Sequence, residues 1–588
     1  MCTHPPPART APGWWLPVVV VLGLALHLPS LGLGFWADDY VHQLVLDGDL
    51  RTTHLRPSSV YDFGDAADWQ SLGEDAATRI WWTSPDWKIR FLRPLSSLAL
   101  RAEHALLGGW APGYHVMSLA WYAACLLLAH GVYRAIDIPP RAAVLATALW
   151  ATTNGSALPV GWIANRNTVE ATALTLAAVL VAARTRRLRW VALSLALASA
   201  ACAAKESGVV AFPLVGAVLL LRARGGGASL PRRGAAVGAA AAVVLAAAYV
   251  ATLMIAGYGT RSVFYATPWG DPFRYLANLG VLFSAGLLRL LAPVPLDLMQ
   301  AVPSAARVVP WLGLAIVLPI AWVISKPLRG SPTAGFLALW VALGLLPQGG
   351  TLASDRLLME AAVGSAGLLA LFVTAVLGAG RDTTARWQRR LAMSLLITAG
   401  ALSALFTVVQ SATMRRFARE SRAVVLSADV GPPELGTRDV FLLQSGSGFI
   451  AFALPSTWWI ESRDHDLRFW AVQLGPRALS WRREDQRTCL IRSLDEPFFT
   501  GPFESVYRSS DVPPSRGTVF HAGDLRVEVV SVDAAGVRAL RLHFARDLDD
   551  PRVRFLVDRG GRFVRQPAPA VGETTLIPRA SPTIPMLP

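Results

Sequence analysis

Charged residues are scarce in this chain of 588 residues: 16% are Asp, Glu, Lys or Arg, whereas 53% are hydrophobic. Soluble domains usually carry more charge, and the mean hydropathy of +0.41 excludes an ordinary soluble enzyme. Apolar runs long enough to span a lipid bilayer recur along the chain. The sequence therefore indicates a polytopic membrane protein.

Lysine and cysteine are also rare. Three lysines stand among 55 basic residues, a bias more typical of a GC-rich genome than of a binding preference. The net charge of +15 is not gathered into a compact basic module with interleaved aromatic residues, so we expect no nucleic-acid partner. The scattered cysteines indicate neither a disulfide framework nor a metal cluster; they are Cys2, Cys125, Cys202 and Cys489.

Hydropathy along the chain predicts about eleven membrane spans. The first is flanked by Trp14 and Trp15 at one end and by Phe35 and Trp36 at the other, as in an aromatic belt. It has no clear small-residue cleavage site, so we expect a retained helix and not a signal peptide. The predicted spans are residues 14–34, 112–133, 142–157, 167–183, 190–204, 208–221, 234–256, 308–325, 333–347, 357–379 and 391–412.

Arginine-rich connections predict the orientation of these spans. Five connections hold sixteen Lys or Arg against two acids, and such loops lie in the cytoplasm. A crossing by the further apolar piece 276–292 would carry Lys326 and Arg381 to the outer side. We therefore predict that 276–292 is re-entrant or lies in the interface, where protein shields its backbone. The five connections are 134–141, 184–189, 222–233, 326–329 and 380–390.

Two regions outside the spans are expected to fold. In the loop 35–110, apolar residues at helical spacing between Leu92 and Leu106 predict an interfacial amphipathic helix. Short β-rich runs follow the last span, separated by Gly, Pro and Asp. We expect a membrane domain over 1–412 and an extracytoplasmic, mostly antiparallel β domain over 413–588, with a loosely ordered tail from Gln566.

An adjacent acidic pair, Asp38 and Asp39, stands where the first span leaves the membrane. Carboxylates at this position cost free energy unless water, a cation or a reacting group compensates them. The pair either ends the helix in solvent or supplies a catalytic base at the mouth of a membrane-embedded site.

Cations at four separate places in the chain share the outer side with this pair. Each has a plainer interpretation, since Arg93 and Arg356 could contact lipid phosphates and Lys205 could neutralise Glu206. Together, cations around an interfacial carboxylate favour departure of a phosphate from a lipid-linked donor, while the carboxylate activates an acceptor. The cations are Arg93, Arg166, Lys205 and Arg356.

Six short motifs follow one another along the predicted membrane domain. They are Ala37-Asp38-Asp39-Tyr40, residues 91–95, Tyr114-His115, Trp162 with Arg166, Ala204-Lys205-Glu206, and Ser354-Asp355-Arg356-Leu357. This succession resembles membrane glycosyltransferases of the GT-C superfamily, most closely the protein O-mannosyltransferase branch with tetratricopeptide tails. The resemblance covers roughly residues 14–412.

The resemblance implies transfer of a sugar from a polyprenyl-phosphate carrier on the extracytoplasmic face. We expect an inverting single displacement, with a protein, glycan or lipid as the acceptor. The resemblance makes Asp38 or Asp39 the catalytic carboxylate. We favour Asp38 as the general base and Asp39 as the residue that orients the acceptor. The candidates to bind the donor phosphate are Arg93, Arg166, Lys205 and Arg356. Candidate substrate contacts are His115, Trp162 and Glu206, of which His115 is as readily structural.

The chain also departs from that branch. Asp355-Arg356-Leu357 stands in place of its usual Glu-Arg-Tyr, and no tetratricopeptide repeat follows the last span, so the acceptor is expected to differ. We expect no metal or other cofactor, because the acidic pair lacks further ligands at a suitable spacing. We also expect a bacterial inner-membrane protein with its site and C-terminus in the periplasm.

Two other classes of function remain open. A transporter or flippase of an anionic lipid or solute would use the same charges, although transporters commonly show internal repeats and none is apparent here. An envelope assembly protein with a degenerate site would bind through its β domain. Incubation with a labelled polyprenyl-phosphate sugar separates the three classes.

Overall fold

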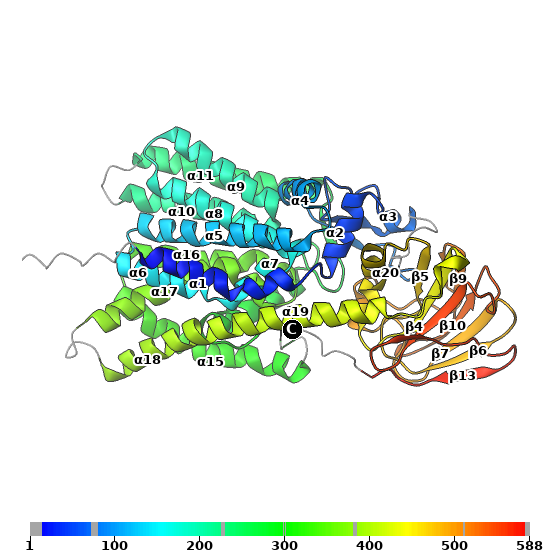
Figure 1. Cartoon of the computed structure of the whole chain (residues 1–588). Coiled ribbons are helices and arrows are strands. Elements are labelled where there is room, and N and C mark those ends of the chain that lie inside the picture. Colours follow the sequence, from blue (N-terminus) through cyan, green and yellow to red (C-terminus); the bar gives the residue numbers. More distant parts are fainter. Residues whose placement is uncertain are drawn as a thin grey trace, which may run out of the picture.

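The chain forms an elongated molecule with a helical bundle at one end and a β-rich domain at the other (Figure 1). This computed structural model describes residues 14–71, 80–224, 230–297, 299, 302–379, 385–509 and 512–581. The predicted class, a mainly helical membrane bundle followed by a β-rich domain, is confirmed.

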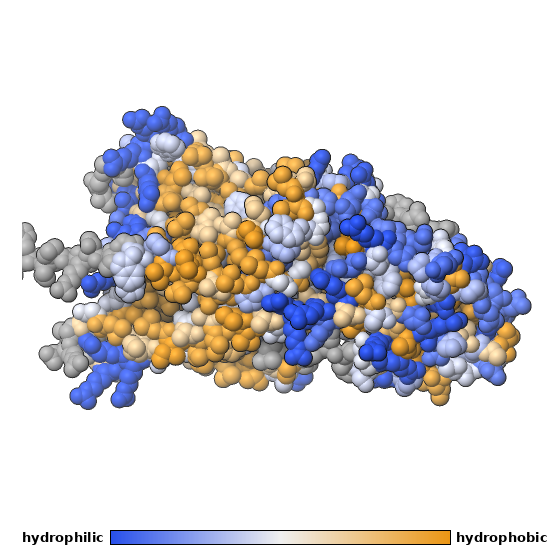
Figure 2. Space-filling model, in the orientation of Figure 1, coloured by the Kyte–Doolittle hydropathy of each residue, from blue (hydrophilic) through white to orange (hydrophobic). Residues whose placement is uncertain are grey.

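Nine helical segments among the described residues are long and apolar enough to cross a membrane. Large apolar side chains such as Val243, Ile255 and Trp311 are exposed on the bundle flank, which forms a broad hydrophobic surface in Figure 2. Such a surface requires lipid around it, so the protein is an integral membrane protein. The nine segments contain α1 (Trp15–Leu26), α5 (Ala111–Ala135), α10 (Ala211–Arg224), α11 (Arg232–Ile255), α12 (Pro272–Val281) with α13 (Leu287–Leu291), α15 (Pro303–Leu328), α16 (Pro332–Leu345), α17 (Met359–Gly378), and α18 (Arg386–Leu396) with α19 (Ser403–Leu426).

Less apolar or shorter helices complete the bundle. The predicted span 142–157 is broken into two helices with a 3-10 turn between them, and 167–183 is a continuous helix that packs closely on its neighbour in sequence. These helices are α6 (Pro140–Ala151), α7 (Ala157–Gly161), α8 (Asn167–Arg184) and α9 (Leu188–Ala204).

The basic connections gather at the end of the bundle away from the β domain. Arg222 pairs with Asp137, and Thr333 donates a hydrogen bond to the Ile136 carbonyl at 3.0 Å. Figure 2 shows hydrophilic surface at this end, beyond the apolar flank. The connections therefore share one side, as the predicted topology requires; Arg381 and Asp382 lie outside the described residues.

The apolar piece 276–292 lies within the run that forms α12 and α13, which starts near the β-domain end of the bundle. There Asn278 donates a hydrogen bond to the Gly349 carbonyl. Gly313 of α15 packs directly on the backbone of Ser284, and further along both runs Leu291 lines the same apolar cavity as Ile324. The two runs are therefore parallel and start at the same end. The first run, Pro272–Leu291, is long and apolar enough to cross a membrane, so the re-entrant path stays a prediction.

The first loop folds between the bundle and the β domain. It contains α2 (Asp38–Asp47), β1 (Asp62–Asp65), α3 (Ala66–Ser71), β2 (Lys88–Arg90) and α4 (Pro94–Leu107), and β2 also pairs with β3 (Gly259–Arg261). The predicted amphipathic helix is α4, which exposes Leu98 and Leu106 and buries Ser96 and Glu103. An outward apolar face suits a helix in a membrane interface.

The C-terminal domain follows α19, which continues to Leu426, past the predicted span end at residue 412. One sheet is antiparallel throughout, in the order β13 (Thr574–Ile577), β6 (Leu479–Arg483), β7 (Thr488–Ser493), β10 (Gly536–His543), β9 (Leu525–Asp533) and β8 (Val519–Ala522). The other has the order β12 (Phe563–Arg565), β11 (Val553–Asp558), β4 (Arg438–Gln444) and β5 (Leu467–Ala471), and its β4 is parallel to both neighbours. Most strand pairs of the two sheets are antiparallel, as predicted. Helix α20 (Gly448–Ser462) connects β4 to β5. Strand β13 lies in the tail expected to be loosely ordered and pairs with β6.

The sheets share one core, in which Trp481 packs against Phe555. A short helix, α21 (Pro502–Ser505), lies between β7 and β8 in the chain.

Direct hydrogen bonds hold the β domain on the first loop. The Trp81 indole donates to the Ala471 carbonyl at 2.7 Å, and the Arg508 side chain donates to the Trp82 carbonyl at 2.7 Å. The Ser84 amide donates to the Tyr507 carbonyl at 2.8 Å. The β domain therefore supports the loop that presents the acidic pair.

Candidate functional site

A cavity of about 500 Å³ lies where the bundle meets the first loop. Separate stretches of the chain contribute to it: α2, the end of β2, the turn before α8, the junction between α9 and α10, and the turn before α17. Six of the nine predicted site residues line this cavity, so the fold brings them together. They are Asp38, Arg93, Trp162, Lys205, Glu206 and Arg356.

Asp38 opens helix α2 and lines the cavity. The preceding Gly34 and Ala37 have φ values of 78° and 51°, a conformation that turns the chain sharply out of the first membrane helix. No described residue donates a hydrogen bond to the Asp38 carboxylate. Burial raises the pKa of Asp38 to about 6, although Arg356 and Arg93 oppose the shift. A carboxylate with this pKa is suited to act as a base near neutral pH.

Asp39 has a different environment. One carboxylate oxygen accepts the Ala164 amide at 2.6 Å and the other accepts the Trp36 amide at 3.0 Å, while the side chain is 1% exposed and does not line the cavity. Burial raises the pKa of Asp39, and the two amides partly counter the shift. This geometry favours an anchor for the start of α2 over the predicted role in orienting an acceptor.

The cations of the cavity differ in their partners. Arg93 binds Glu206 through two nitrogens, at 3.0 and 2.8 Å, so its charge is matched. Lys205 donates to the Thr168 hydroxyl at 2.6 Å, and the Arg356 guanidinium lies 5.5 Å from the centre of the Trp162 ring. Among the described residues, no carboxylate lies within ion-pair distance of Lys205 or Arg356. Burial and the charges of Arg93 and Arg356 lower the pKa of Lys205, whereas an anion beside Lys205 would favour its charged form. Arg356 and Lys205 can therefore bind an anion that enters the cavity.

Three further side chains of the cavity wall have buried polar atoms without full hydrogen bonding. The Trp162 indole N–H and the Asn165 amide nitrogen have no partner among the described residues, and neither ring nitrogen of His42 makes a hydrogen bond of normal geometry. Buried polar groups are nearly always paired, so these atoms indicate a polar ligand. The sequence interpretation assigned no role to Asn165 and did not consider His42. His42 stands one helical turn after Asp38, a spacing that puts both on one face of α2.

Arg166, a predicted phosphate ligand, lies outside the cavity lining. It pairs with Glu103 and Glu170 and donates to the Tyr114 carbonyl at 3.0 Å, while its side chain is 2% exposed. These partners engage all of its guanidinium nitrogens. Arg166 therefore ties α4 and α5 to α8, and its geometry favours a structural role over phosphate binding.

His115 is also buried outside the cavity lining. A ring nitrogen lies 3.0 Å from the Gly34 carbonyl, to which it donates. This contact fixes the turn that precedes Asp38. The structural alternative for His115 is thus favoured over a substrate contact.

Arg356 is positioned by its buried neighbour in sequence. Asp355 accepts hydrogen bonds from Arg289, Asn154 and the Leu296 amide, each at 2.9 Å. Arg289 lies in α13, and Leu296 lies in the segment between α13 and α15. Helix α13 and the segment that follows it therefore hold the turn from which Arg356 reaches the cavity.

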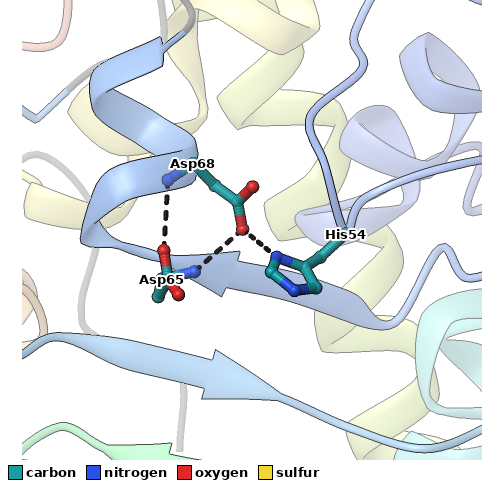
Figure 3. A group of neighbouring side chains, drawn as sticks. All are labelled: His54, Asp65 and Asp68. Carbon is teal, nitrogen blue, oxygen red and sulfur yellow. Dashed lines mark hydrogen bonds and ion pairs between the residues drawn. The ribbon is translucent and has the colours of Figure 1, made fainter.

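A second group of polar side chains lies in the first loop (Figure 3). His54 pairs with Asp68, and the possible ligand atoms of His54, Asp65 and Asp68 lie within 4.8 Å of one another. Asp68 also accepts the amides of Thr53 and Asp65, and Asp65 accepts the amide of Asp68. These bonds fasten α3 to the loop and occupy oxygens that a cation would need, so we assign the group a structural role.

No protein-family model and no curated protein matches the chain. Similar solved structures include the oligosaccharyltransferase of Archaeoglobus fulgidus tethered with an acceptor peptide, at 13% identity and a TM-score of 0.36 over 77% of this chain and 64% of that chain. ArnT from Cupriavidus metallidurans bound to undecaprenyl phosphate aligns at 11% identity and a TM-score of 0.40 over 78% and 86%. The chain thus spans less than two thirds of the archaeal enzyme. Similarity this weak assigns neither a family nor an activity.

Proposed function

We propose that this protein is a membrane glycosyltransferase of the GT-C type that transfers a sugar from a polyprenyl-phosphate donor to an extracytoplasmic acceptor. The observation that carries the proposal is the cavity in which the Asp38 carboxylate, free of hydrogen bonds from described residues, faces the unpaired cations Lys205 and Arg356. A base and an anion site within one cavity are what displacement of a lipid phosphate needs.

The donor lipid has a suitable path in this cavity. Its wall includes Val210 near the start of α10, Tyr249 and Leu253 of α11, and Leu343 of α16. Helix α11 also exposes apolar side chains to the membrane. A prenyl tail would lie along these residues and remain in the bilayer, while its phosphate reaches Lys205 and Arg356.

The transfer would be a single displacement with inversion. The acceptor hydroxyl oxygen attacks the anomeric carbon and its proton passes to Asp38, while the bond from that carbon to the phosphate oxygen breaks. The leaving polyprenyl phosphate takes the electron pair of that bond. Lys205, Arg356 and the N–H groups of Trp162 and Asn165 stabilise its growing negative charge.

The remaining cavity charges would hold the phosphate site together. Glu206 neutralises and orients Arg93, which lies 4.3 Å from the centre of the Phe91 ring. Arg93 then acts at the edge of the site, beside the two unpaired cations. The mechanism assigns no step to a metal or another cofactor.

The orientation and domain roles are part of the same proposal. The basic connections lie at the opposite end of the bundle from the cavity, and basic loops face the cytoplasm. The cavity and the C-terminal domain would then face the periplasm of a bacterial inner membrane. The β domain, which begins after α19 and rests on the first loop, would help to present a protein, glycan or lipid acceptor.

Binding and turnover of defined lipids test this function. We expect the full chain in lipid nanodiscs to bind undecaprenyl phosphate more tightly than undecaprenol, because Lys205 and Arg356 contact the phosphate. It should also release or transfer label from undecaprenyl phosphate carrying radiolabelled mannose or glucose. Equal affinity for both lipids would contradict the anion site, and transport of the labelled lipid without cleavage would favour a flippase.

A further inference from the structure

His42 combines three features that the proposed mechanism does not use. It follows Asp38 by one turn of α2, it lines the cavity, and its side chain is 1% exposed. Its ring packs edge-on against Tyr61, with centroids 4.8 Å apart, and stacks with Phe63 at 6.0 Å. Tyr61 and Phe63 line the cavity as well. These residues form one wall beside the base, here named the α2 wall: His42, Tyr61 and Phe63.

The His42 ring has unused hydrogen-bonding capacity. Burial and the charge of Arg93 lower the pKa of His42 to about 3, so the imidazole is neutral and offers one donor and one acceptor. The backbone of Val60 lies near the ring, but neither ring nitrogen forms a hydrogen bond of normal geometry with a described residue. At least one ring nitrogen is therefore free to contact a ligand. A buried polar atom in this state costs free energy until a ligand pairs with it.

The chemistry of this wall differs from that of the phosphate site, although Arg93 lies 5.3 Å from the centre of the Tyr61 ring. In an inverting displacement the anomeric carbon lies between the base and the leaving phosphate, so the sugar ring must lie beside Asp38. The phosphate has the unpaired cations Lys205 and Arg356, whereas a neutral imidazole is a poor partner for a dianion. A sugar hydroxyl suits His42, since it can both donate and accept a hydrogen bond.

We propose that His42 is a specificity-determining residue, which hydrogen-bonds a hydroxyl of a neutral hexose on the polyprenyl-phosphate donor. Tyr61 and Phe63 hold the imidazole in place and present apolar ring faces to the C–H groups of the sugar. This inference rests on the proposed function. It adds the class of sugar and the residue that recognises it.

Affinities for lipids with and without a sugar test the inference in the full chain. The probes are undecaprenyl phosphate, undecaprenyl phosphate mannose and undecaprenyl phosphate glucose, measured by native mass spectrometry in nanodiscs. We expect wild-type protein to prefer at least one sugar-bearing lipid over undecaprenyl phosphate. His42→Phe keeps a ring between Tyr61 and Phe63 but removes one hydrogen bond to the sugar. Its affinity for the preferred sugar-bearing lipid should fall about tenfold, whereas its affinity for undecaprenyl phosphate should change by less than about twofold.

Matched variants separate a sugar contact from a general effect. His130→Phe alters a half-buried histidine that contacts Thr147 away from the cavity, and it should behave as wild type. His42→Gln restores a donor and an acceptor and should recover most of the affinity. If His42→Phe reduces the yield of folded protein, His42→Leu replaces it with the same expected loss.

Three results would overturn the inference. They are an unchanged sugar-lipid affinity in the His42 variants, an equal loss for undecaprenyl phosphate, and a wild-type protein that binds both sugar lipids no better than undecaprenyl phosphate. Failure of wild-type protein to bind undecaprenyl phosphate at all would instead contradict the proposed function.

Discussion

Two arginines at the same end of the bundle show how differently similar residues are used. Arg166 and Arg356 each stand in a turn that leads into an apolar helix. Arg166 is enclosed by Glu103, Glu170 and a backbone carbonyl. Arg356 lies over the Trp162 ring and lines a cavity, with no carboxylate at ion-pair distance among the described residues.

The hydrogen-bond and ion-pair partners of a charged side chain, and not its charge alone, distinguish a structural residue from a binding residue. A buried charge that is fully paired stabilises the surrounding packing only while its partners remain. An unpaired cation beside a cavity retains its capacity to bind an anion. The acidic pair shows the same contrast, since Asp39 accepts two amides whereas Asp38 faces the cavity.

The largest expected effect separates the two aspartates. Asp38→Asn should lower transfer from radiolabelled undecaprenyl phosphate sugars by about 10³-fold, because a positioned general base contributes about 10²–10⁴-fold. Its thermal unfolding should be unchanged. Asp39→Asn should lower Tm, because it weakens two buried hydrogen bonds, while the folded fraction keeps activity. Full transfer activity of Asp38→Asn would contradict the assignment of Asp38 as the base.

The next largest effect separates the two arginines. Arg356→Gln should weaken binding of undecaprenyl phosphate by about 10- to 100-fold through loss of a charge-assisted contact, with little change in Tm. Arg166→Gln should instead cost about 3 kcal/mol of stability, because it leaves buried carboxylates uncompensated. Titration of the lipid and thermal melting of both variants give the two readouts. A lower Tm in Arg356→Gln together with weaker lipid binding in Arg166→Gln would contradict the roles assigned to the two arginines.

The pH dependence of transfer should follow the raised pKa of Asp38, which lies at about 6. The base acts when deprotonated, so activity should be high at neutral pH and fall about tenfold between about pH 7 and about pH 5. An aspartate with an ordinary pKa would remain ionised over that range. A profile that stays flat down to about pH 5 would contradict Asp38 as a base with a raised pKa.

The smallest effect concerns how Arg356 is held. Arg289→Met removes one partner of Asp355 and should weaken undecaprenyl phosphate binding about fivefold, because the turn that carries Arg356 loosens. In an Arg356→Gln background the same substitution should cause little further loss. Additive losses in the double variant would show that Arg289 does not act through Arg356.

Hydropathy was sufficient to predict the fold class and the position of most helices. Long apolar runs are local signals, and the arginine bias of the connections predicted that these connections lie at the same end of the bundle. The sequence was weaker where the outcome depends on distant pairing. Strand β13 forms because residues 574–577 find an open edge on β6, and β4 is parallel to β5 because α20 joins them. Neither relation leaves a local pattern.

The candidate site was predicted in part for the same reason. Asp38 and Arg356 could be proposed from their place at membrane exits, but Arg166 could not be excluded, because its partner Glu103 is 63 residues away. Asp38 and Asp39 point in directions about 100° apart around α2, which decides which one lines the cavity. The unused nitrogen of His42 is a property of its surroundings and has no sequence signature.

An experimental structure of the full chain with undecaprenyl phosphate tests the central claim most directly. We expect the phosphate within hydrogen-bond distance of Lys205 and Arg356, the prenyl chain against α11, and the Asp38 carboxylate across the cavity from the phosphate. A phosphate bound at the arginine-rich opposite end of the bundle, with the Asp38 cavity empty, would contradict the account.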